Sequence, residues 1–108
     1  MDFRDQLRTL AQLLHEGGGD DLAVMVEDAA CGSDEALNGF LVSNNLWGGS
    51  GSIADQGGLL RDGRRTEARR KVEHALIQLG NEQIRIGLTN VRTAMCVEAF
   101  RKRETSGI

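Results

Sequence analysis

The stretch DFRDQLRTLAQLLHEGGG, residues 2–19, decides the fold class. Its large apolar residues recur at intervals of four, three and four, which is the spacing of one face of an α-helix. They are Phe3, Leu7, Leu10 and Leu14. Asp2 precedes them as an N-cap, and three glycines follow, as glycine does just beyond a helix C-terminus. The stretch therefore predicts an amphipathic helix.

The same helical period continues along the chain. Apolar stripes predict helices that begin at Asp20, at Ser33 and near Arg64, and a last helix that ends at Arg103. We expect Asp20 and Asp21 to cap the second helix and Ser33 to cap the third. The second stripe consists of Leu22, Met25, Val26, Ala29 and Ala30, and the last consists of Val91, Met95, Val97 and Phe100.

No strand is expected, because no segment alternates apolar and polar residues and no hairpin turn joins two β-rich runs. In the long helix, Gly80 costs about 1 kcal/mol of helix propensity. We expect the helix to continue across it, since the apolar phase is kept on both sides. The 108 residues predict one all-α domain. It is a compact bundle of four to five helices, with a glycine-rich connecting loop at residues 46–63 and a frayed tail at residues 104–108.

The composition excludes several classes of protein. Hydrophobic residues make up 40% of the chain, but no apolar run is long enough to span a membrane. The start of the chain lacks the basic and apolar segments of a secretory signal. Cys31 and Cys96 lie in apolar helical patterns outside any CxxC motif, which favours buried free thiols over the alternative, a disulfide. We therefore expect a cytoplasmic protein of bacterial type.

The charges are divided unevenly along the chain. Residues 1–58 carry ten acidic and two basic side chains, whereas residues 59–108 carry six acidic and eleven basic ones. Either the two halves fold against each other and neutralise one another, or an acidic surface stays open to a basic partner. The residues that we expect to bind such a partner are Asp20, Asp21, Glu27, Asp28, Asp34 and Glu35.

A glycine-rich loop begins with LWGGSGSIADQGG at residues 46–58, which holds five of the fourteen glycines and the only tryptophan. It is neither a P-loop nor a dinucleotide loop, because no lysine follows its glycines and no strand precedes it. We interpret it first as a turn around a buried Trp47, with a short helical turn that starts at Ser52. The alternative is an anion site built on backbone N–H groups. Its residues would be Trp47, Ser50, Gly51, Ser52 and Asp55.

Other chemical motifs are weak. Neither His15 nor His74 has the spacing of a zinc or di-iron ligand, so no metal and no cofactor is expected. Adjacent acidic residues point about 100° apart on a helix and do not converge on a catalytic centre. The basic run Arg61–Lys71 has no interleaved aromatic residue, and the chain is acidic overall, which disfavours nucleic acid as a partner.

The segment Val42–Gln56 resembles a small bacterial domain family whose pattern has the core Trp-Gly-Gly-x-Gly-Ser-Ile-x-Asp. The resemblance continues through Leu79–Arg85 and Gly87–Thr93 and covers residues 37–100. It implies a stand-alone bacterial domain and adds no catalytic residue, because that family has no established activity. Val91 stands where proline is expected in relatives, which predicts a looser turn in this chain.

Together these features favour a non-catalytic protein-interaction module. Small acidic helical proteins without a visible active site include immunity proteins, which neutralise a cognate toxin by covering its active site. We expect a protein partner, in the first place a basic bacterial toxin domain bound by the acidic side chains. The alternative is a ligand-binding protein or enzyme that holds a small anion or nucleotide in the glycine-rich loop. The sequence leaves the oligomeric state open, a homodimer included.

The two functions differ in a thermal-shift experiment. An anion or nucleotide bound by the folded loop would raise the melting temperature by mass action. The interaction module predicts a flat response to phosphate, sulfate and nucleotides. An increase that saturates with ligand concentration would contradict the interaction module and support the ligand site.

Overall fold

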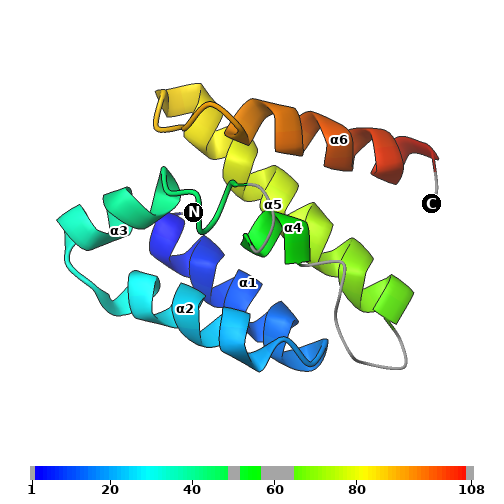
Figure 1. The fold of residues 1–108 in the computed structure, drawn as a ribbon, viewed down its shortest axis with the longest axis horizontal. Coiled ribbons are helices and arrows are strands. Elements are labelled where there is room, and N and C mark those ends of the chain that lie inside the picture. The colour runs from blue at the N-terminus through cyan, green and yellow to red at the C-terminus, as the bar shows by residue number, and fades with distance from the viewer. Residues whose placement is uncertain (1, 49–51, 57–64, 107–108) are drawn as a thin grey trace.

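The computed structural model describes residues 2–48, 52–56 and 65–106, and these form helices and no strand (Figure 1). The all-α prediction is therefore confirmed for the described part of the chain. None of the described helices is both long and apolar enough to cross a membrane. The helices are α1 (Phe3–Glu16), α2 (Asp20–Cys31), α3 (Asp34–Leu41), α4 (Ile53–Gln56), α5 (Arg65–Ile86) and α6 (Thr93–Ser106).

Helix α1 lies in the middle of the fold. It packs against α2 and against α5, and α6 packs on α5, so the long helices follow the order α2, α1, α5, α6 across the molecule (Figure 1). The shorter α3 adjoins α2. Helices α2 and α6 therefore lie on opposite sides of the α1–α5 pair.

The helix starts follow the turn chemistry of the sequence, with one exception. Asp2 and Ser33 cap α1 and α3 as predicted, each accepting a hydrogen bond from the backbone N–H three residues later. Asp20 and Asp21 do not cap α2, because the N-cap is Gly19 and no side chain bonds there. Both aspartates lie in the first helical turn instead, where a carboxylate interacts favourably with the helix dipole.

One apolar core joins the helices. Trp47 is the largest fully buried side chain in it, with 0% of its surface exposed. The short helical turn predicted after Ser52 is present as α4 and adds Ile53 to this core. Its other fully buried large residues are Leu7, Leu10, Leu14, Val26, Leu41, Leu46, Leu76 and Leu79.

Two of the predicted apolar stripes contain residues that are exposed. Met25 of α2 is 37% exposed, whereas Ala23 is buried in its place. Val91 and Met95, near the start of α6, are 93% and 61% exposed. Helices α2 and α6 each pack on a single long neighbour, so only a narrow stripe of each is covered. Helix α6 also continues beyond Arg103, its predicted end.

Both cysteines are free, but the prediction that both are buried is wrong. Cys31 is exposed and Cys96 is half-buried. Cys31 is the last residue of α2 and follows the exposed Val24 by seven residues, which places the two on the same side of the helix. Its thiol therefore faces away from the core.

Helix α5 continues across Gly80, as predicted. A Cβ atom at this position would lie 2.2 Å from Cγ2 of Val97 and 3.1 Å from Cη2 of Trp47. The missing side chain lets α6 and the indole ring approach α5 closely. Gly80 therefore serves packing and does not bend the helix.

Gly80→Ala should destabilise the protein by up to about 2 kcal/mol, because overpacking costs about 1–3 kcal/mol and the gain in helix propensity offsets only about 1 kcal/mol of it. Gly39→Ala is the matched control, since a Cβ at this exposed position of α3 meets no atom within 4 Å. It should stabilise the protein by up to about 1 kcal/mol. Urea unfolding followed by circular dichroism measures both changes. Stabilisation by both substitutions would contradict tight packing at Gly80.

Candidate functional site

The exposed side of α2 carries four carboxylates around two apolar side chains. Val24 and Met25 are 49% and 37% exposed and lie between an acidic pair in the first turn and another pair seven residues later. Residues seven apart lie on the same side of a helix, so the pairs flank the apolar residues from both ends. We call this surface the acidic face, and it consists of Asp20, Asp21, Val24, Met25, Glu27 and Asp28.

No basic residue from the C-terminal half neutralises the acidic face within the described part of the chain. The ion pairs between described residues join partners within residues 1–58 or within residues 59–108. Asp21 and Asp28 form no ion pair with any described residue. Of the two arrangements that the sequence allowed, these residues favour the open acidic surface.

His15 of α1 borders the acidic face. Its Nδ1 lies 2.8 Å from Oδ1 of Asp20, and its Nε2 lies 3.2 Å from Oε1 of Glu27. The hydrogen bonds to Asp20 and then to Glu27 raise the pKa of His15 above its usual value of 6.5, because they favour the charged imidazolium. Protonated His15 therefore joins α1 to α2 and adds one positive charge beside the acidic face. No three ligating side chains of the described residues are placed to hold a metal ion.

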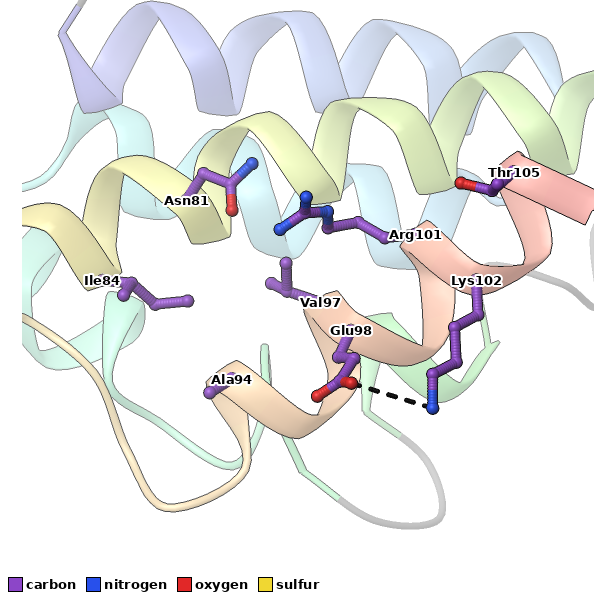
Figure 2. A pocket seen from close by; sticks show the side chains of 8 residues that line it. All are labelled: Asn81, Ile84, Ala94, Val97, Glu98, Arg101, Lys102 and Thr105. Carbon is purple, nitrogen blue, oxygen red and sulfur yellow. Dashed lines mark ion pairs between the residues drawn. The ribbon is translucent and has the colours of Figure 1, made fainter.

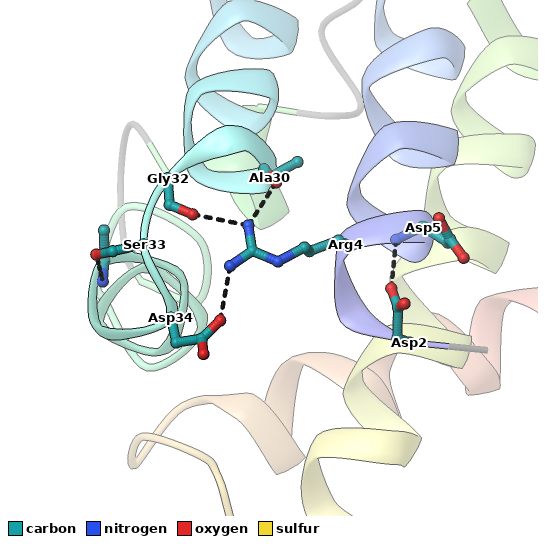
Figure 3. A network of polar contacts seen from close by, with 8 residues as sticks. Asp2, Arg4, Asp5, Ala30, Gly32, Ser33 and Asp34 are labelled. Atoms are coloured by element: carbon teal, nitrogen blue, oxygen red, sulfur yellow. Dashed lines mark hydrogen bonds and ion pairs between the residues drawn. The ribbon is translucent and has the colours of Figure 1, made fainter.

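The two remaining acidic residues of the predicted set, Asp34 and Glu35, belong to α3. The guanidinium of Arg4 donates to the carbonyl oxygens of Ala30 and Gly32, at 2.7 and 2.8 Å, and to Asp34 at 2.8 Å (Figure 3). Arg4 thereby satisfies carbonyl groups at the end of α2 and fixes the turn into α3. Asp34 thus contributes to the fold, whereas Glu35 is exposed and forms no ion pair with a described residue.

Trp47 has its polar partner inside the protein. Its Nε1 donates to Oε1 of Gln83 at 2.9 Å. Gln83 is itself fully buried, and its Nε2 lies 2.8 Å from the carbonyl oxygens of Leu41 and Leu88. The indole and the amide thus satisfy each other in the core, as buried polar groups require.

Asn90 ties the same segment to the turn between α5 and α6. Its Nδ2 lies within 3.2 Å of the carbonyl oxygens of Val42, Ser43 and Trp47. Its Oδ1 accepts hydrogen bonds from two backbone N–H groups at the start of α6. The prediction that this turn is looser than in relatives, made because Val91 stands where proline is expected, stays a prediction. The side chain of Asn90 thus joins this turn to the segment that carries Trp47.

The described part of the glycine-rich loop serves packing. Ser52 is buried, and its hydroxyl donates to the carbonyl oxygen of Gly48 at 3.1 Å. Ser50 and Gly51 lie outside the described residues, as does the side chain of Asp55. Trp47 and Ser52 thus have partners within the fold, and the anion site stays a prediction.

Sequence reasoning missed Val24 and Met25 as surface residues. Val24 received no role, and Met25 was assigned to the core. The sequence did contain a signal, because the small residues of α2 form a complete stripe on the other side of the helix. This buried stripe consists of Ala23, Val26, Ala29 and Ala30. Its small side chains let α2 approach α1 closely and leave Val24 and Met25 outside.

No protein family model, curated protein or solved structure matches the chain. The resemblance to the small bacterial family stays a prediction.

Protonation of His15 should make folding stability depend on pH. The folded pKa is raised above the unfolded value of 6.5, so the stabilisation is fully present below pH 6.5 and is lost as the pH rises through the folded pKa. The difference in free energy of unfolding between wild type and His15→Gln should therefore shrink over this interval. Urea unfolding at a series of pH values measures it.

Nuclear magnetic resonance titration of the His15 ring gives the pKa directly. Asp20→Asn should move this pKa back toward 6.5, because the largest cause of the shift is removed. A ring pKa at or below 6.5 in the wild type would contradict the arrangement around His15.

Proposed function

We propose that the protein is a non-catalytic interaction module that binds a basic protein partner through the acidic face of α2. The observation that carries the proposal is the pair Val24 and Met25, exposed between four carboxylates on one helix. Protein interfaces have this composition, in which an apolar centre is surrounded by a polar rim.

The charge of the acidic face indicates the chemistry of the partner. Its carboxylates attract a basic surface and raise the rate of encounter with it. Catalytic domains that act on polyanions such as nucleic acids present basic surfaces of this kind. An acidic module that covers such a surface excludes the substrate. We therefore favour an immunity-type inhibitor of a basic toxin domain.

The acidic face is held rigidly, which favours tight binding. Helix α2 packs along α1 through its buried alanines, and Arg4 fixes its C-terminal end through Ala30 and Gly32. His15 adds a contact near the other end. Little conformational entropy is then lost when a partner binds, so more of the contact energy contributes to affinity.

Charge reversal on the acidic face should weaken binding. Immobilised protein would capture the partner, mass spectrometry would identify it, and surface plasmon resonance would give both rate constants. Asp21→Lys/Asp28→Lys should reduce affinity by about tenfold or more, mainly through slower association. Val24→Ala/Met25→Ala should act mainly through faster dissociation.

The matched control is Glu67→Lys/Glu104→Lys, which makes the same change in net charge at exposed positions on α5 and α6. It should bind like the wild type. Wild-type affinity in the Asp21→Lys/Asp28→Lys variant would contradict the proposal. Stoichiometric loss of the partner's catalytic activity on adding wild-type protein tests the inhibitory role.

A further inference from the structure

A groove runs between α5 and α6 (Figure 2). These two helices follow α1 in the order α2, α1, α5, α6, so α1 separates them from α2 (Figure 1). Its volume is about 660 Å³, within the range of sites that take a ligand or an inserted side chain. Ile84, Ala94 and Val97 give it an apolar lining. The proposed function makes no use of this surface.

Arg101 of α6 provides the positive charge of the groove. Its side chain extends toward α5 and Asn81 (Figure 2), and it forms no ion pair with any described residue. The neighbouring Lys102 is already paired with Glu98, at 3.7 Å. A guanidinium that has no ion-pair partner among the described residues, and that lies beside an apolar lining, fits a carboxylate that is carried next to an apolar side chain.

The acidic face of α2 offers this combination. Val24 and Met25 are exposed apolar groups, and the nearby Asp21 and Asp28 have no ion-pair partner among the described residues. The complementarity extends to the whole chain, since residues 1–58 carry an excess of acidic and residues 59–108 an excess of basic side chains. We propose that α2 of one copy docks into the α5–α6 groove of a second copy, with Asp21 or Asp28 paired to Arg101.

The positions of the two surfaces determine the kind of assembly. Because α2 and the groove lie on opposite sides of the α1–α5 pair, one rigid copy cannot use both on the same neighbour. The contact is therefore head-to-tail, and association continues beyond the dimer as the concentration rises. This self-association needs no foreign partner, although it covers the acidic face that the proposed partner would bind.

Sedimentation of the purified full chain tests the assembly. At low ionic strength the average mass should rise above that of the monomer with increasing concentration, and it should fall back at high salt. Arg101→Glu should sediment as a monomer. Arg92→Glu, an exposed charge reversal outside the groove, should sediment like the wild type.

A mixing experiment separates the two surfaces. Arg101→Glu keeps an intact acidic face, whereas Asp21→Asn/Asp28→Asn keeps an intact groove and cannot pair with the new glutamate, and each should be monomeric alone. Their equimolar mixture should form one heterodimer that grows no further, because a single intact contact remains between them. Circular dichroism confirms that both variants are folded.

The proposal would be overturned if the wild type stayed monomeric at every concentration, or if the equimolar mixture of the two variants stayed monomeric. So would assembly of Arg101→Glu to the extent seen for Arg92→Glu. No foreign partner is present in these measurements. Their failure therefore leaves the proposed inhibitory function standing, and failure of that function leaves the self-association standing.

Discussion

The fold depends on the burial of Trp47 against α5 and α6. The ring is the largest apolar group of the core, and its burial stabilises the protein by a few kcal/mol. Two features make it possible: Gly80 leaves space for the ring edge, and Gln83 accepts the hydrogen bond of Nε1. Without that acceptor, the buried N–H would cost about 1–3 kcal/mol. The segment that carries Trp47 is thus fixed to helices that follow it by more than thirty residues.

This central packing keeps the opposite charges of the chain apart. Helices α1 and α5 form the middle of the molecule, with the acidic α2 on one side and α6 on the other. Many of the ion pairs are local, such as Lys71 with Glu67 and Lys102 with Glu98, one helical turn apart. The acidic face consequently keeps its charge. Two surfaces of different chemistry result from a single core.

Helical period predicted the long helices well, because apolar residues recur at helical spacing within each of them. It also indicated the continuity of α5 at Gly80 and the structural role of Trp47. The orientation of α2 and α6 was less predictable. Each packs on one long neighbour, so only one of two adjacent apolar stripes is buried. The helical spacing alone predicts Met25 and Met95 in the core, whereas both are exposed. The partners of Gln83 and Asn90 come from distant parts of the sequence, and no local pattern reveals them.

The two proposed uses of the acidic face exclude each other, and their chemistry ranks them. Docking to a second copy offers the carboxylates the guanidinium of Arg101, which forms no ion pair with a described residue. A polyanion-binding partner offers several basic groups over a larger area, so it would displace the second copy. Without such a partner, the proposed self-association would cover Val24 and Met25, whose exposure otherwise promotes unspecific contacts. The groove between α5 and α6 would in this way protect the apolar centre that the proposed partner contacts.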